Sequence, residues 1–186
     1  MEKIAIIGAG LMGVGFAAVF APAGHDVTLH DPYPDVLNSA KPRLSAILND
    51  IGADVSAMHR VTIAPDLAKA VAKADIILEA VIEKLPLKQD LFERIEAAAR
   101  SDAIFASNTS SIPITQVMAK VKNKSRALGA HWFNPPYLVP LVEVIQTADT
   151  DMMYIEHMIA LLKRLGKVAV HVKKDVPGFV GNRMQH

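Results

Sequence analysis

Short apolar runs alternate along this chain with longer segments whose apolar residues recur at helical spacing. The short runs predict strands at Lys3 to Ile7, Asp26 to His30, Val61 to Ala64, Asp75 to Ala80, Ala103 to Ala106, Ala127 to Ala130, Leu141 to Ile145 and Val168 to Val172. The longer segments predict helices at Leu11 to Ala21, Val36 to Asp50, Asp66 to Lys73, Leu85 to Arg100, Ile114 to Val121 and Thr150 to Leu165. Regular alternation of strand and helix is typical of an α/β fold with a largely parallel sheet.

The helix predicted over residues 85–100 has the clearest apolar face. Leu87, Leu91, Ile95 and Ala98 recur at the spacing that places side chains on one side of a helix.

Composition and charge narrow the classes of protein that the chain can represent. Hydrophobic residues make up 51% of the 186 positions and aromatic residues 5%, which suits one domain with a real core and argues against disorder. A formal net charge of +1 gives no strong field for nucleic acid or acidic membranes, so we expect neither as a partner. The absence of cysteine excludes disulfides and thiolate chemistry and fits a reducing compartment, so we expect a cytoplasmic protein.

Three glycines follow the first predicted strand with the spacing G-x-G-x-x-G, within the segment GAGLMG. Gly8 permits a tight turn, Gly10 lets a pyrophosphate approach the backbone, and Gly13 lets the following helix pack close to the sheet. The helix N-terminus supplies free N–H groups and a positive dipole for the phosphates. The alternative is a glycine-rich turn that binds no ligand. The preceding strand and following helix favour a dinucleotide-binding loop.

An acidic residue stands at the end of the second predicted strand. Asp31 comes eighteen positions after Gly13, near the usual place of the carboxylate that binds the ribose diol. A carboxylate there accepts hydrogen bonds from a 2′-hydroxyl and repels a 2′-phosphate. The sequence therefore predicts NAD rather than NADP as the cofactor.

A second group of polar residues follows the later strands. Asn108 and Ser110 come just after the fifth predicted strand, and the carboxyl ends of parallel strands face the ligand in such sheets. His131 follows the sixth strand, and a proline-rich turn leads to a strand that carries Glu143. We expect that turn to bring Glu143 beside His131, where a carboxylate fixes the imidazole tautomer and stabilises the imidazolium. The alternative for His131 is a packed core histidine, whereas a carboxylate such as Glu143 amid apolar neighbours is costly unless paired.

Two other kinds of catalytic site find no support in the sequence. Ser110 has no G-x-S-x-G elbow around it, which argues against a serine hydrolase. The remaining histidines show no metal-ligand spacing, so no metal site is expected. They are His25, His30, His59, His157, His171 and His186.

Seven motifs, taken together and in order, resemble the L-3-hydroxyacyl-CoA dehydrogenase family over nearly the whole chain. They are GAGLMG at 8–13, Asp31, VIEKLPLK at 81–88, SNTSS at 107–111, HWFNP at 131–135, LVEV at 141–144 and VPGFVGNR at 176–183. The resemblance implies a Rossmann-type, doubly wound sheet that binds NAD. It also implies an NAD-binding domain over 1–176 and the start of a linker over 177–186.

The resemblance implies roles in the chemistry for five residues. His131 is the implied catalytic base, and Glu143 is its carboxylate partner. Ser110 and Asn182 are expected to hold the substrate carbonyl or hydroxyl near the base, and Asn134 to shape the same pocket. The alternative for Asn182 is a residue that only marks a helix end.

The resemblance also implies a cofactor-binding set. Glu83 and Lys88 are expected to contact the nicotinamide ribose; the alternative is an exposed ion pair on the first turns of a helix. The whole set is Gly8, Gly10, Leu11, Met12, Gly13, Asp31, Ala80, Glu83, Lys88 and Asn108.

Two departures from the family pattern stand out. Family members carry a helical hairpin that helps to clamp the CoA nucleotide, and Pro32 to Arg60 is short for it, with Lys41 and Arg43 still able to meet phosphates. Family members also carry an all-helical C-terminal domain that dimerises and closes over the substrate, and this domain is absent from the chain. We therefore expect a fragment that binds NAD but catalyses poorly alone, and a homodimer in the full-length form.

Three functions are compatible with these features. The leading one is reversible, NAD-dependent oxidation of an L-3-hydroxyacyl-CoA to the 3-oxoacyl-CoA, as in fatty-acid beta-oxidation. The second is NAD-dependent dehydrogenation of a small free hydroxy acid, of the carnitine or L-gulonate type, which keeps the histidine and glutamate and needs no CoA. The third is a non-catalytic NAD-binding protein, against which the His131–Glu143 pair argues because a binder has no use for a base.

Overall fold

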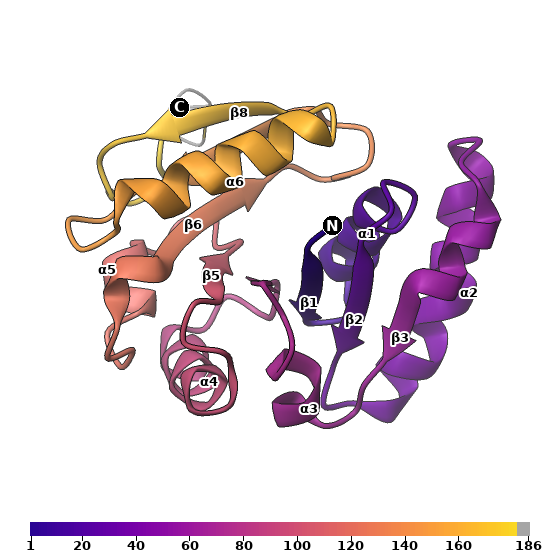
Figure 1. Cartoon of the computed structure of the whole chain (residues 1–186), viewed down its shortest axis with the longest axis horizontal. Coiled ribbons are helices and arrows are strands. Elements are labelled where there is room, and N and C mark those ends of the chain that lie inside the picture. Colours follow the sequence, from indigo (N-terminus) through magenta and orange to yellow (C-terminus); the bar gives the residue numbers. More distant parts are fainter. Residues whose placement is uncertain (182–186) are drawn as a thin grey trace.

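The computed structural model describes residues 1–181, and this part of the chain forms an eight-stranded sheet (Figure 1). The strand order is β3-β2-β1-β4-β5-β6-β7-β8. β7 runs antiparallel to β6, and the other neighbouring strands are parallel. The strands are β1 (Lys3–Ile7), β2 (Asp26–His30), β3 (Val61–Ile63), β4 (Ile76–Glu79), β5 (Ile104–Ser107), β6 (Ala127–Trp132), β7 (Leu141–Ile145) and β8 (Val168–Val172).

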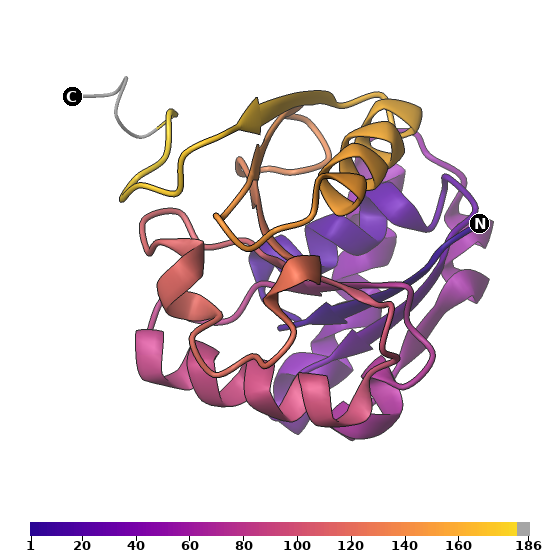
Figure 2. The ribbon, with the colours of Figure 1, turned by 60° about the vertical axis from the view of Figure 1, so that its left-hand side comes forward.

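Helices cover both faces of this sheet, so the domain has three layers. Helices α1, α2 and α6 pack on one face and α3, α4 and α5 on the other; α6 and α4 lie on opposite sides in both views (Figure 1, Figure 2). The helices are α1 (Leu11–Phe20), α2 (Pro34–Asp50), α3 (Leu67–Val71), α4 (Leu85–Ala98), α5 (Ile114–Val117) and α6 (Met152–Arg164), with 3-10 helices η1 (Val55–Arg60) and η2 (Lys124–Arg126). Within residues 1–181, no helix is both long and apolar enough to cross a membrane.

The predicted α/β class and largely parallel sheet are confirmed, and the predicted elements appear in order. Central strands such as β4 are buried along their whole length because helices cover both faces, which explains their continuous apolar sequence. The Asp66 carboxylate caps α3 by accepting a hydrogen bond from the Lys69 N–H at 2.8 Å, as predicted. The region of the expected hairpin contains the single helix α2 followed by η1.

Three details of the sequence prediction were wrong. Helix α5 ends at Val117 rather than Val121, since residues 118–120 form turns. On α4 the side chain of Leu87 is 40% exposed, because Lys88 turns inward instead and pairs with a buried carboxylate. Strand β6 continues through Trp132, so His131 lies within the strand rather than after it.

The order of the strands reverses at one place in the sheet. After β1 the chain adds β2 and β3 on one side, and it then returns to place β4 on the other side of β1. In doubly wound folds, ligands bind beyond the carboxyl ends of the strands at such a switch point. The carboxyl edge around β1 and β4 is therefore where a ligand is expected.

Candidate active site

The glycine loop joins the carboxyl end of β1 to α1. Gly8 has a φ of +107°, which favours glycine, and its N–H donates to the His30 carbonyl at 2.8 Å. A Cβ added at Gly13 would lie 1.8 Å from the Gly8 oxygen, whereas one added at Gly10 would meet no heavy atom within 4 Å. The loop is thus tightly packed against the protein at Gly8 and Gly13, whereas the space at Gly10 is open. This open space fits a pyrophosphate that approaches the backbone of Gly10.

Two charged side chains hold this loop from the side of β2 and α2. The Asp31 carboxylate, 8% exposed, accepts hydrogen bonds from the Ala9 N–H at 2.9 Å and the Tyr33 N–H at 3.0 Å. The Arg43 guanidinium donates to the Gly10 carbonyl at 2.8 Å and to the Ala9 carbonyl at 3.2 Å. Arg43 therefore lies at the glycine loop.

The other predicted residues near this loop lie at its rim. Leu11 is 62% exposed at the first turn of α1, and Met12 is partly buried there. The Ala80 carbonyl packs against Gly8, where an added Cβ would come within 2.6 Å of it. Lys41 is exposed on α2.

His131 and Glu143 are direct neighbours across the antiparallel pair β6 and β7. The imidazole Nδ1 and the carboxylate Oε2 are 2.7 Å apart, and the two residues are 5% and 2% exposed. The strand register brings the pair together, rather than the proline-rich turn alone. With Nδ1 donating to Glu143, the ring nitrogen Nε2 presents a lone pair that can accept a proton.

The second oxygen of Glu143 is bound by backbone that follows β8. Oε1 accepts hydrogen bonds from the N–H groups of Val180 at 3.0 Å and Gly181 at 2.9 Å. Phe179 is 1% exposed, and its ring lies 5.8 Å from the His131 ring. A carboxylate with three donors is held in one orientation, so it in turn fixes the imidazole.

Asn108 of the predicted cofactor set and Asn134 of the predicted substrate pocket differ in how closely the structure links them to His131. The Asn108 side-chain oxygen accepts a hydrogen bond from the Trp132 N–H at 2.8 Å, which ties the end of β5 to β6 beside His131. Asn134 is exposed in the loop after β6. Asn182 lies outside the described residues.

Glu83 connects the loops after β4 and β5. Its Oε1 accepts hydrogen bonds from the Thr109 hydroxyl and the Ser110 N–H, and its Oε2 lies 3.1 Å from the Lys88 ammonium. Burial alone would raise the pKa of the Glu83 carboxyl, but the Thr109 hydrogen bond and the Lys88 charge outweigh it and hold that pKa below 4.5. Lys88 is only 1% exposed, so the alternative of an exposed Glu83–Lys88 pair is wrong.

The lowered pKa of Glu83 predicts a pH dependence of stability. A carboxyl whose folded-state pKa is depressed contributes stability that is present above the unfolded value of 4.5 and is lost as the pH falls through the folded-state pKa. Glu83→Gln should therefore lower the free energy of unfolding most above pH 4.5, and the difference should shrink in more acidic solution. Urea unfolding of both proteins over a pH series measures this difference, and a difference that grows on acidification would contradict it.

The structure also shows two features that sequence analysis missed. Glu79, the last residue of β4, is fully buried and binds Lys88. A carboxylate beside apolar strand residues was the signal that singled out Glu143, and the same signal is present at Glu79. No sequence pattern marks Val180 and Gly181 as backbone donors to Glu143. They contact it only because the chain after β8 folds back toward β7.

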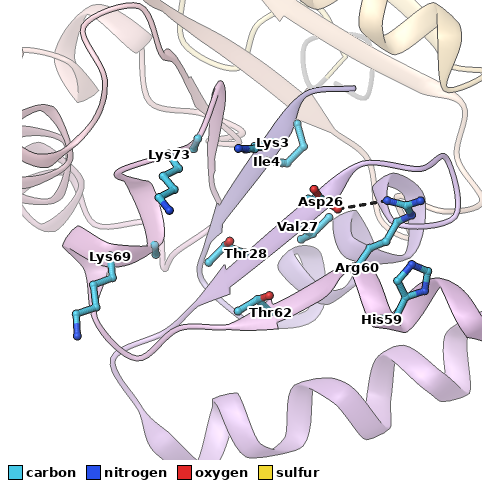
Figure 3. A pocket seen from close by; sticks show the side chains of 12 residues that line it. Lys3, Ile4, Asp26, Val27, Thr28, His59, Arg60, Thr62, Lys69 and Lys73 are labelled. Carbon is cyan, nitrogen blue, oxygen red and sulfur yellow. Dashed lines mark hydrogen bonds and ion pairs between the residues drawn. The ribbon is translucent and has the colours of Figure 1, made fainter.

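Within residues 1–181, neither a group of metal-ligating side chains nor the hollow drawn in Figure 3 lies at the carboxyl edge of the sheet. Among residues 1–181, no group of three or more His, Cys, Asp or Glu side chains is placed to hold a metal ion. A hollow of about 290 Å³ lies near the amino ends of β1 and β2. Its lining includes Lys3, Lys69, Lys73, Thr28, Thr62 and the Arg60–Asp26 ion pair (Figure 3). None of the predicted site residues lines it, so it is separate from the carboxyl edge.

A family model and similar known proteins indicate the same family for this chain. A family model described as the NAD-binding domain of 3-hydroxyacyl-CoA dehydrogenase matches residues 3–176. The 5-formyl-3-hydroxy-2-methylpyridine 4-carboxylate 5-dehydrogenase of Mesorhizobium japonicum is 37% identical over 99% of this chain and 61% of its own length. The L-carnitine dehydrogenase of Streptomyces griseus is 35% identical over 100% of this chain and 56% of its own length.

A solved structure supports the same relationship. The crystal structure of 3-hydroxybutyryl-CoA dehydrogenase from Escherichia coli matches with a TM-score of 0.93 at 34% identity, over 98% of this chain and 40% of that chain. The chain thus spans about 60% of the length of the two curated relatives named above. The names of these three proteins give three different substrates at nearly equal identity.

Proposed function

Since this chain belongs to the NAD-binding-domain family of 3-hydroxyacyl-CoA dehydrogenases, oxidoreductases that act on CH–OH groups with NAD, we propose that it oxidises the 3-hydroxyl of an L-3-hydroxyacyl-CoA. The reaction is reversible, yields the 3-oxoacyl-CoA, and is of the fatty-acid beta-oxidation type. The observation that carries the proposal is the buried His131–Glu143 pair, with 2.7 Å between nitrogen and oxygen. This acid/base unit stands at the same edge of the sheet as a loop suited to a dinucleotide.

For the cofactor we propose the residues that line this edge from β1 to β5. The glycine loop takes the pyrophosphate, and Asp31 takes the ribose diol. Glu83 takes a hydroxyl of the nicotinamide ribose, with Lys88 holding its carboxylate. The full set is Gly8, Gly10, Leu11, Met12, Gly13, Asp31, Ala80, Glu83, Lys88 and Asn108. Bound NAD⁺ supplies the hydride acceptor.

For the chemistry we propose that His131 moves the proton. Its Nε2 accepts the proton of the substrate hydroxyl during oxidation and returns it during reduction. Glu143 keeps the opposite nitrogen protonated and stabilises the imidazolium that forms. Burial of both residues strengthens this charge interaction relative to water.

For the substrate we propose contacts on both sides of His131. Ser110 and Asn182 hold the oxygen that reacts, Asn134 shapes the pocket, and Lys41 and Arg43 bind the CoA phosphates. Arg43 already binds carbonyls of the glycine loop, so it is the weaker of the two for this role.

A hollow formed by the end of β8 and the segment after it favours an acyl substrate. It measures about 520 Å³ and is lined by Val172, Val176, Phe179 and Val180, together with Lys173 and Lys174 among others. Apolar side chains suit an acyl chain, and neighbouring lysines suit an anionic carrier. The same hollow borders the backbone that binds Glu143 and the ring that faces His131.

The second candidate is a dehydrogenase of a small free hydroxy acid. The observation that favours it is the segment after β2, which holds one helix and a short 3-10 helix where a hairpin would clamp a CoA nucleotide. One of the curated relatives is an L-carnitine dehydrogenase, which also supports this second candidate.

The domain organisation belongs to the same proposal. Residues 1–176 form the NAD-binding domain and 177–186 begin the linker to a helical domain that dimerises and covers the substrate. The relatives named above are longer than this chain, which supports such a domain in the whole protein.

The direct test compares two substrates in the full-length gene product. NADH oxidation is measured with acetoacetyl-CoA and with free acetoacetate under the same conditions. A strong preference for the thioester is expected. Equal or faster use of the free acid would move the protein to the second candidate, and no turnover of either while NADH still binds would contradict both.

A further inference from the structure

A cluster of three charges lies beside the proposed nicotinamide position, with Glu79 and Lys88 buried and the Glu83 side chain 36% exposed. Glu79 is 0% exposed at the end of β4, and its Oε1 lies 2.6 Å from the Lys88 ammonium. The same ammonium lies 3.1 Å from the Glu83 carboxylate. The cluster of Glu79, Lys88 and Glu83 thus contains two carboxylates and one ammonium.

Three hydrogen-bond donors surround the Glu79 carboxylate, an arrangement that suits an ionised carboxylate. Its carboxylate accepts from the Lys88 ammonium, from the Val81 N–H at 2.7 Å and from the Ser107 hydroxyl at 2.6 Å. An ionised carboxylate only accepts hydrogen bonds, so it satisfies all three donors, whereas a protonated carboxyl would bring a fourth donor. With Glu83 ionised as well, the three side chains carry a net charge of −1.

Glu79 and Lys88 neutralise each other in the interior, so the surplus negative charge of the cluster is that of the partly exposed Glu83. Removing two ions from water is expensive, and a buried ion pair replaced by neutral groups of similar size is often neutral or stabilising. A Lys88–Glu83 pair alone would also leave the cluster neutral. Loss of the Glu79 charge alone would therefore change the net charge of the cluster from −1 to 0.

The cluster lies between the glycine loop and the His131–Glu143 pair. Ala80, the residue after Glu79, packs against Gly8. On the other side, Glu83 binds Thr109 and Ser110, and the adjacent Asn108 binds the backbone of Trp132. A dinucleotide that extends from the loop to His131 therefore passes this cluster with its nicotinamide end.

We propose that Glu79 sets the relative affinity of this domain for the two redox states of its cofactor, by giving the cluster a net negative charge beside the nicotinamide ring. The ring is cationic in NAD⁺ and neutral in NADH, so a nearby net anion stabilises the oxidised form selectively. This inference rests on the proposed placement of the nicotinamide. Two unit charges about 10 Å apart at an effective dielectric near 20 interact strongly enough for a change of about tenfold.

The test measures the dissociation constants of NAD⁺ and NADH for parent and variants by calorimetry, without substrate. Glu79→Gln keeps the shape of the side chain and makes the cluster neutral. The ratio Kd(NAD⁺)/Kd(NADH) should rise about tenfold. Ser107→Ala is the matched control, since it removes a hydrogen bond from the same carboxylate without changing any charge, and its ratio should equal that of the parent.

A double variant keeps the test decisive if Glu79→Gln alone folds poorly. Glu79→Gln/Lys88→Gln leaves Glu83 as the single charge, so the net charge returns to −1 and the ratio should return toward the parent value. Equal changes in both dissociation constants for Glu79→Gln, or the same ratio shift in Ser107→Ala, would overturn the proposal. These binding constants need no turnover, so a failure here is distinguishable from a failure of the proposed reaction.

Discussion

His131→Gln should reduce turnover by roughly 100- to 10,000-fold while the affinity for NADH stays within about twofold. Glutamine is close in size to histidine and can still hydrogen-bond Glu143, but it cannot take a proton from a hydroxyl. The glycine loop and Asp31 lie on other strands, so cofactor binding has no reason to change. Turnover is measured by NADH oxidation, and affinity by the fluorescence of bound NADH.

His59→Gln provides the matched control for that experiment. His59 is an exposed histidine in η1, far from β6, and its replacement should leave turnover unchanged. A His131→Gln protein that retains full turnover would show that another group moves the proton. Loss of NADH affinity in step with turnover would show that His131 is needed for binding rather than for the chemistry.

Gly13→Ala should destabilise the fold by about 3 kcal/mol and abolish measurable NADH binding. An added Cβ would lie 1.8 Å from the Gly8 oxygen and 2.9 Å from its carbonyl carbon, both backbone atoms that cannot turn aside. The helix and the loop must therefore separate, and the N–H groups at the start of α1 lose their alignment. Thermal unfolding and NADH titration measure the two effects.

Gly10→Ala separates phosphate access from packing in the same loop. A Cβ at Gly10 meets no protein atom within 4 Å, so the melting temperature should change little. NADH affinity should still fall at least about tenfold, because the methyl group occupies the face that a pyrophosphate approaches. An unchanged affinity in Gly10→Ala would place the phosphates elsewhere.

The fold was predictable because its signals are local. Buried strands such as β1 and β4 are continuous apolar runs, and the glycine spacing marks the turn into α1. The class and the order of elements follow from these runs. The sequence predictions were wrong where a contact between distant residues overrides the local pattern. On α4, for example, Lys88 points into the interior and Leu87 is not on the buried face.

The candidate site was predictable only in part, for the same reason. A carboxylate on an apolar strand pointed to Glu143, and the structure places it against His131. The register that joins them depends on β6 reaching Trp132, which propensity did not predict. The donors of Val180 and Gly181 arise from a return of the chain across 37 and 38 residues, and no periodic pattern encodes such a contact.

Lys88 and Glu79 show most clearly which contacts cannot be predicted from sequence. A lysine on a helix is ordinary in sequence, and the signal of a carboxylate on the apolar strand at Glu79 does not identify its partner. Only the packing of α4 on the sheet brings the ammonium within 2.6 Å of the carboxylate in the interior. Long side chains reach partners that sequence spacing does not specify.

Hydride transfer itself is the measurement that tests the central claim most directly. NADH carrying deuterium at the transferable position of its nicotinamide is mixed with acetoacetyl-CoA and the full-length gene product, and the product is analysed by mass spectrometry. We expect deuterium at the carbon that bears the new hydroxyl in the parent protein, and a rate of labelling in His131→Gln that falls together with turnover. Bound NADH with no label in the product of the parent protein would contradict the account.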